Sequence, residues 1–70
     1  MREAEVRARL KQIAHDIRGP ITTIGGFSEL LEQSLAEDDE RRAHLAAIRR
    51  AVRRLRELAD RLSHEAQGGD

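Results

Sequence analysis

The chain has 70 residues, enough for one small domain, and a core of that size is only marginally stable without a staple or a partner. It contains no cysteine, which excludes disulfides and cysteine-based zinc sites, and Phe27 is its only aromatic residue. The 13 basic and 13 acidic residues balance, and no apolar run approaches about 20 residues, so we expect no nucleic-acid partner and no membrane contact by this segment.

The first half carries one amphipathic pattern, which predicts a helix over about residues 2–35. Leu10, Ile17, Ile24 and Leu31 are seven residues apart, and this spacing continues unchanged through Pro20. If Gly19-Pro20 separated two helices, the two registers would have no reason to match. We therefore predict one helix that is kinked at Pro20. The apolar positions of its seam are Val6, Leu10, Ile13, Ile17, Ile24, Phe27 and Leu31.

The second half repeats the pattern and predicts a helix over about residues 40–64. Asp38 or Asp39 can cap its free amide groups, and Arg61 and His64 suit its last turns. Residues 67–70, with the Gly68-Gly69 pair, are expected to form a flexible tail after a domain of residues 1–66. The apolar positions are Leu45, Ile48, Val52, Leu55, Ala59 and Leu62.

Only a few residues connect the two predicted helices, so they must run antiparallel as a hairpin. Further apolar residues lie at the margin of each stripe and would remain wet in a lone hairpin. We therefore expect an all-α fold in which two hairpins pair into a homodimeric four-helix bundle. The marginal residues are Ile21, Leu30, Leu35 and Leu58.

His15 lies off the apolar seam, between Ile13 and Ile17, so its ring should face water. An exposed imidazole is free to act as a nucleophile or base. Its neighbours at helical spacing include Lys11 and Arg18, which can donate to a phosphate. Three glycines and a proline follow within twelve residues, and each of them lowers the stability of the helix. Such broken rules favour a functional site at which the helix bends.

The residues around this histidine resemble the dimerisation and phosphoacceptor domain of sensor histidine kinases, the HisKA type. The stretch HDIRGPITTIGGFSELL is similar to the family's H-box helix, and RRAVRRLRELADRL is similar to its arginine-rich second helix. The resemblance covers about residues 5–65. It implies that this chain takes part in two-component signal transduction.

Carried over by position, the resemblance assigns a role to each residue of the motif. His15 would accept the γ-phosphoryl group of ATP on Nε2 and pass it to an aspartate of a response regulator. Asp16 would hold the other ring nitrogen and act as general base. Arg18 would be a charge partner of the phosphate, and Pro20 would be the bend that lets the upper helix move.

The resemblance implies partners that this segment does not contain. Nothing after Leu62 resembles the family's nucleotide-binding boxes, so ATP and Mg²⁺ would be bound by a separate catalytic domain of a parent protein-histidine kinase. The segment itself would hold no cofactor, and its partners would be a second copy, the ATP-binding domain and the receiver domain of a response regulator. We expect it to be an excised part of a cytoplasmic region, with any membrane anchor elsewhere in the parent.

Gly19 departs from the family pattern, in which threonine or asparagine often stands four residues after the histidine and positions a water. A glycine there predicts weak phosphatase activity. It also favours regulator access to His15, and it opens an alternative: a stand-alone histidine phosphotransfer protein, in which small residues leave the imidazole open to the regulator.

Two interpretations come from other classes of protein. The arginines of the second helix resemble those of an RNA-binding helical hairpin dimer like Rop, although acidic residues offset them and no aromatic residue is present there to stack a base. A purely structural coiled-coil module would explain everything except HDIRGP. His44 and His64 have no carboxylate partners at metal-ligand spacing, so we predict no metal site.

Overall fold

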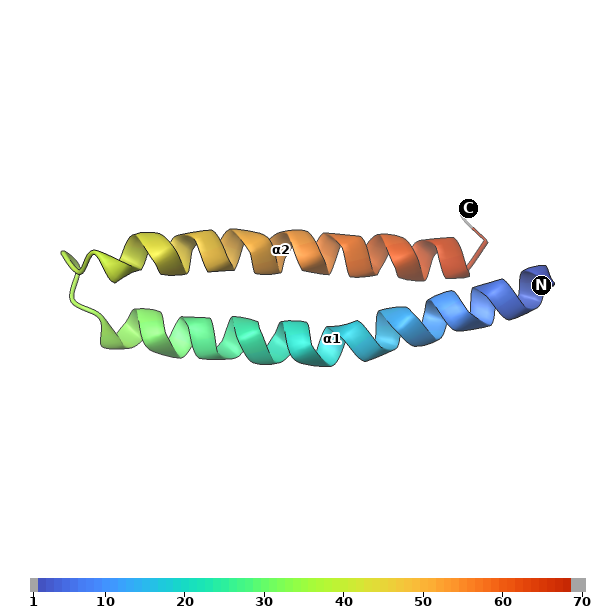
Figure 1. Cartoon of the computed structure of the whole chain (residues 1–70), viewed down its shortest axis with the longest axis horizontal. Helices are drawn as coiled ribbons and strands as arrows, with labels where there is room; N and C mark the ends of the chain where they lie inside the picture. Colours follow the sequence, from blue (N-terminus) through green and yellow to red (C-terminus); the bar gives the residue numbers. More distant parts are fainter. Residues whose placement is uncertain (1, 69–70) are drawn as a thin grey trace.

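The computed structural model describes residues 2–68 and consists of two α-helices, α1 (Glu3–Ser34) and α2 (Arg41–Ala66). They run antiparallel and are joined at one end by residues 35–40 (Figure 1). The predicted hairpin is confirmed, and each helix begins and ends within two residues of its expected bounds. Gly69 and Asp70, the end of the expected tail, lie outside the described residues.

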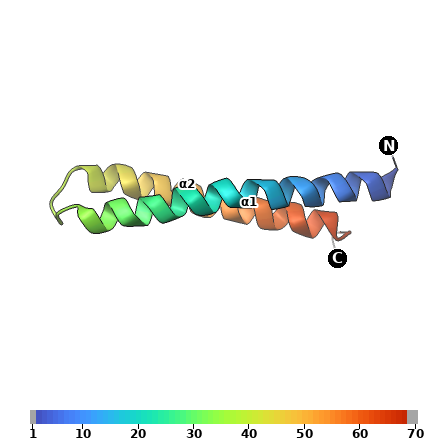
Figure 2. The same cartoon turned by 90° about the horizontal axis from the view of Figure 1, so that it is seen from below.

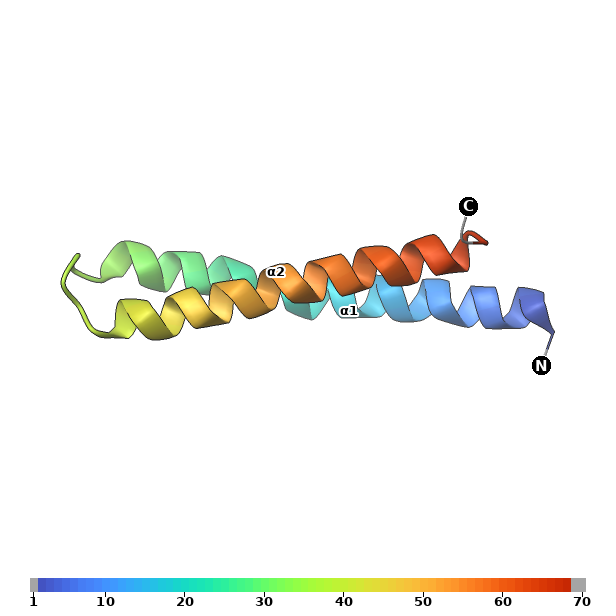
Figure 3. The same ribbon diagram turned by 90° about the horizontal axis from the view of Figure 1, so that it is seen from above.

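The two helices form a rod 54 Å long and 18 by 16 Å across. Seen from below and from above, they cross one another along their length (Figures 2 and 3). A crossing of this kind is typical of helices that pack through a seven-residue repeat.

The hairpin core is built from residues seven apart on both helices. Ala14, Ile21 and Ser28 are buried on α1, and they face Leu45, Val52 and Ala59 on α2. The sequence-predicted seam on α1 was therefore wrong as a description of the hairpin core: Ile21, expected at the margin, is 5% exposed, whereas Ile24 is 47% exposed. A seven-residue repeat produces two neighbouring apolar stripes, and periodicity alone does not say which one meets the other half of the same chain.

This core is thin, and a second apolar stripe stays in water. The accessible surface of the chain is 5674 Å², against about 4,400 Å² expected for a folded monomer of this mass. The excess exceeds the roughly 800 Å² that one partner contributes to a standard interface. The exposed large hydrophobic residues are Val6, Ile13, Ile24, Phe27, Leu30, Leu31, Ile48, Leu55 and Leu58.

Pro20 lies inside α1, which continues past it without a break, as the unchanged heptad spacing predicted. Proline has no amide hydrogen, so the Asp16 carbonyl loses the donor that residue 20 would otherwise supply. Figure 1 shows α1 changing direction near its middle, where the segment carrying the N-terminus turns relative to the remainder. The Thr23 hydroxyl donates to the Gly19 carbonyl at 3.1 Å, one of the local bonds that accompany the bend.

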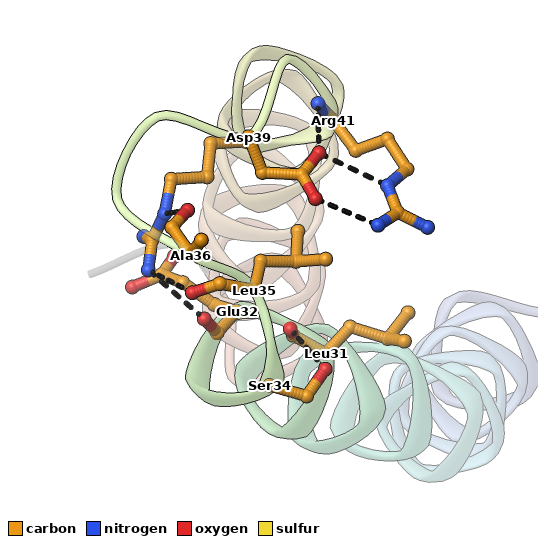
Figure 4. A network of polar contacts seen from close by, with 8 residues as sticks. Leu31, Glu32, Ser34, Leu35, Ala36, Asp39 and Arg41 are labelled. Carbon is orange, nitrogen blue, oxygen red and sulfur yellow. Dashed lines mark hydrogen bonds and ion pairs between the residues drawn. The ribbon is translucent and has the colours of Figure 1, made fainter.

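Arginine and aspartate side chains satisfy the helix ends at the connection. Arg42 donates from Nε to the Ala36 carbonyl at 2.7 Å and from Nη2 to the Leu35 carbonyl at 2.8 Å, which occupies acceptors at the end of α1. The N-cap of α2 is Glu40, and the preceding Asp39 accepts the Arg41 amide at 2.9 Å, so Asp39 satisfies one of the free amide groups. Figure 4 shows the carboxylate of Asp39 against the guanidinium of Arg41, with the acceptor carbonyls of α1 close by.

The Asp39 contacts predict an acid-dependent part of the stability. Hydrogen bonds from the Arg41 side chain and then from its amide lower the pKa of Asp39 from 3.8 to about 2. Because these bonds favour the ionised carboxylate over the neutral acid, their contribution is present above about pH 4 and is lost as the pH falls toward 2. We expect Asp39→Asn to lower the melting temperature at pH 7 and to match the wild type near pH 2, as measured by circular dichroism.

A matched control for this pH dependence is Asp38→Asn. Asp38 is exposed and makes no hydrogen bond or ion pair within residues 2–68. Its substitution should leave the difference between pH 7 and pH 2 unchanged. An equal effect of the two substitutions would show that the connection responds to net charge and not to the Asp39 cap.

The neighbouring glycines of α1 should respond differently to alanine. A Cβ at Gly26 meets no atom within 4 Å, so Gly26→Ala should raise the free energy of unfolding by about 1 kcal/mol, since alanine is the better helix former. A Cβ at Gly25 would lie 2.8 Å from Nη2 of Arg56 and 3.4 Å from Cγ1 of Val52. Gly25→Ala should therefore gain less, because Arg56 must move. Urea unfolding midpoints compare the two, and an equal gain at both positions would contradict the close approach of Arg56.

Candidate functional site

His15 lies in the middle of α1 on a face that neither the hairpin core nor the exposed apolar stripe uses. It follows the buried Ala14 by one residue, which turns its ring about 100° away from α2. Its side chain is 83% exposed. A large or charged partner can therefore approach the ring directly.

Asp16 lies beside the ring and fixes which nitrogen faces water. Its Oδ1 is 3.2 Å from Nδ1 of His15, the contact that the family resemblance implies. With the proton on Nδ1, this carboxylate accepts it, and Nε2 presents its lone pair to solvent. The arrangement places an exposed ring nitrogen on one side of the imidazole and a carboxylate on the other.

Gln12 is a residue of this site that the sequence interpretation missed. Its Nε2 donates to the same Oδ1 of Asp16 at 2.8 Å, so the carboxylate is held from both sides. The sequence contains a pattern that could have indicated it, because a glutamine four residues before an aspartate on an exposed helix face is a known stabilising pair. Gln12 thus orients the group that orients the imidazole.

Arg18 does not point toward His15. Its guanidinium reaches across to α2, where Nη1 donates to Oδ1 of Asp60 at 3.0 Å and Nη2 donates to Oγ of Ser63 at 2.9 Å. A third bond runs from Nη2 to the Ala59 carbonyl at 3.3 Å. These acceptors are more than 40 residues away in the sequence, and no local pattern marked them.

Gly19 and Pro20 lie four and five residues after His15, within the two turns that follow it. A Cβ at Gly19 would meet nothing within 4 Å, so the surface next to the histidine is open. Beside it, an open groove between the helices is lined by Arg18, Ile21, Thr22, Arg56, Ala59 and Asp60.

Several arginines of α2 are already paired. Arg49 donates to Oε2 of Glu32 at 2.7 Å. This hydrogen bond, together with the negative charges of Glu32 and the nearby Glu29, raises the pKa of Arg49. Arg54 lies 3.3 Å from Glu57 on the same helix. Because carboxylates and carbonyls occupy these guanidinium groups, less positive charge remains to contact a nucleic-acid backbone.

The described part of the chain contains neither a metal-binding group nor a membrane-spanning helix. Across residues 2–68, the histidine and carboxylate side chains form no group of three that could hold a metal ion. Neither α1 nor α2 has an apolar stretch long enough to cross a bilayer.

Comparison with known proteins places the chain in a family. The model for the His Kinase A (phospho-acceptor) domain matches residues 6–69, nearly the whole chain. The chain therefore belongs to the HisKA domain family of sensor histidine kinases. It is also 38% identical over 55 residues to the sensor protein DivL of Caulobacter vibrioides (strain ATCC 19089 / CIP 103742 / CB 15).

That similarity covers 79% of this chain and 7% of DivL, so the chain spans a small part of the curated relative it matches. No solved structure matches the chain. Family membership confirms the resemblance stated from the motif. It also favours the HisKA interpretation of the arginine-rich second helix over an RNA-binding hairpin.

Proposed function

We propose that this chain is the phosphoacceptor and dimerisation domain of a sensor histidine kinase, and that His15 is the residue that carries phosphate. The observation that supports this most strongly is the His15 ring, 83% exposed with Nδ1 at 3.2 Å from Asp16. The proposal adds to family membership the particular residue, its reactive nitrogen and the direction of transfer.

The first step is attack of Nε2 on the γ-phosphorus of ATP, which a separate catalytic domain presents together with Mg²⁺. The Nε2–P bond forms as the bond from phosphorus to the β,γ-bridging oxygen breaks, and ADP leaves with that electron pair. The ring becomes positively charged, and Asp16 stabilises this charge and accepts the Nδ1 proton. Gln12 holds the carboxylate in place for that role.

In the second step the phosphoryl group moves to a response regulator. A carboxylate oxygen of the regulator's aspartate attacks phosphorus, the N–P bond breaks, and the ring takes back its proton. The open surface around Gly19 supports this step, because the receiver domain must bring its aspartate in line with Nε2. ATP is needed for the first step, which supports a cytoplasmic location.

A second copy of the chain is the partner that we propose for the exposed apolar stripe. Ile24, Phe27 and Leu31 on α1 lie on the same side of the hairpin as Ile48 and Leu55 on α2, and all are at least 41% exposed. Two such hairpins would complete the bundle expected from the sequence. His15 lies on another face and would remain accessible in that dimer.

The function is tested by supplying the chain with the ATP-binding domain of a histidine kinase and ATP labelled at the γ-phosphate. We expect label that is stable in alkali and lost in acid, as for phosphate on nitrogen, and its loss from the chain when a phosphorylatable receiver domain is added. Absence of label with an active catalytic domain, or label that never moves to a receiver, would contradict the proposal.

Gly19 predicts weak phosphatase activity toward the phosphorylated regulator, because it has no hydroxyl or amide to position a water. Gly19→Thr should raise the dephosphorylation rate about tenfold or more, and the open space around Gly19 should tolerate the new side chain. Gly19→Val is the matched control, since valine has the shape of threonine without the hydroxyl. A fast wild type that Gly19→Thr does not change would remove this explanation.

A further inference from the structure

Arg18 is the polar link between the two helices at the level of the bend. One guanidinium contacts three acceptors on a single turn of α2: the Asp60 carboxylate, the Ala59 carbonyl and the Ser63 hydroxyl. The other polar links between the helices in residues 2–68 lie toward the connection, where Arg42 and Arg49 bond to the end of α1. The upper part of α1, which carries His15, thus has one polar link to α2 at the level of the bend.

The backbone next to this link is weakened. Pro20 removes the hydrogen bond to Asp16, and Gly19 contributes no side chain that could pack against α2. The upper part of α1 contributes only Leu10, Ala14 and Ile17 to the buried side of the hairpin. Loss of the Arg18 contacts should therefore change how this part lies against α2.

A phosphoryl group on His15 would be a strong competitor for the same guanidinium. His15 and Arg18 are three residues apart on one helix, a spacing at which side chains are neighbours. Arginine binds phosphate oxygens in a two-pronged geometry that a single carboxylate oxygen and a hydroxyl do not match. Arg18 is 44% exposed and Asp60 is 71% exposed, so no packing prevents the side chain from turning.

We infer that Asp60 and Ser63 are positioning residues that compete with a phosphoryl group on His15 for Arg18. With His15 free, Arg18 stays on α2 and the upper part of α1 is held against it. With His15 phosphorylated, Arg18 turns to the phosphate, the link to α2 is lost, and the bend at Pro20 relaxes. The phosphorylation state of one side chain thereby sets the geometry of the hairpin; this link to phosphate rests on the proposed function.

The test measures the distance between the two helices with spin labels at Ala8→Cys and Arg61→Cys. Both positions are exposed, and the chain has no other cysteine. Dilution with unlabelled chain keeps the measured distance within one molecule. The first comparison places a negative charge at position 15 without phosphorylation. His15→Glu should reduce, at least about threefold, the population of molecules in which Arg18 links α1 to α2. The neutral His15→Gln should leave this linked population unchanged.

The second comparison removes the acceptors. Asp60→Asn combined with Ser63→Ala should produce the distance between the helices of the released state with His15 intact. Asp60→Glu, which keeps a carboxylate at this position, should keep the distance of the linked state. Glu57→Gln, which removes a carboxylate elsewhere on α2, should have no effect. If His15→Glu leaves the distance of the wild type, or if Glu57→Gln acts as strongly as Asp60→Asn, the competition for Arg18 is wrong.

The third comparison uses potassium phosphoramidate as a chemical donor. The Nε2–P bond forms as the P–N bond of the donor breaks, and ammonia leaves with the ring proton. ³¹P NMR then reports whether His15 carries phosphate. If His15 carries phosphate and the distance between the helices equals that of the unphosphorylated chain, the inference is wrong. A response to His15→Glu in a chain that never takes phosphate supports the competition and contradicts the proposed function instead.

Discussion

His15→Ala is expected to reduce phosphoryl incorporation from ATP to the background level. Alanine has no nucleophile, and the Arg18 guanidinium, which donates its hydrogen bonds to α2, cannot replace the imidazole. The fold should be unaffected, since the ring is 83% exposed and packs against nothing in the hairpin core. Label incorporation and circular dichroism on the same samples separate loss of chemistry from loss of structure.

The other two histidines serve as controls for this loss. His44 and His64 are exposed on α2, and neither has a hydrogen-bond or ion-pair contact through its ring in the described chain, so neither is held as His15 is. His44→Ala and His64→Ala should each retain the wild-type incorporation. Strong loss of label in either variant, or residual label in His15→Ala, would show that another residue accepts phosphate.

Ile24→Glu combined with Leu31→Glu is expected to convert the proposed dimer into monomers and to lower helicity. Both side chains are about half exposed in the hairpin, at 47% and 54%, and lie on the stripe that the second copy would cover. Two copies would bury four carboxylates without partners, and such burial costs several kcal/mol per charge. The dissociation constant should rise at least about a thousandfold, as measured by analytical ultracentrifugation across a concentration series.

Leu30→Glu is the matched control for the dimer. Leu30 is 59% exposed, yet nine residues, or two and a half helical turns, separate it from the buried Ile21, so it lies on the opposite side of α1. Its substitution should leave the dimer intact. A wild type that sediments as a monomer at all concentrations, or dissociation by Leu30→Glu to the same degree, would contradict the proposed interface.

The helices and the hairpin were predictable because they depend on periodicity and chain length. The heptad spacing through Pro20 predicted a single helix across the bend, and the short connection left only an antiparallel arrangement. The division of the apolar residues was not predictable. Ile21 and Ile24 belong to adjacent stripes of the same repeat, and only the packing of α2 shows that the first is internal and the second is exposed.

The local part of the site was also within reach of the sequence. His15, Asp16 and Gln12 are brought together by helical geometry alone, and the first two were recognised from the motif. The position of Arg18 was not, because its acceptors lie on the other helix and depend on the register between the helices. Contacts that span the hairpin follow from tertiary packing, which a pattern within one helix does not contain.

The central claim concerns one nitrogen atom, and NMR of the phosphorylated chain tests it most directly. In a chain labelled with ¹⁵N at histidine, the coupling to ³¹P identifies both the residue and the ring position. We expect phosphorus on Nε2 of His15 and none on the Nδ1 that faces Asp16. Phosphorus on Nδ1, or on the ring of His44 or His64, would contradict it.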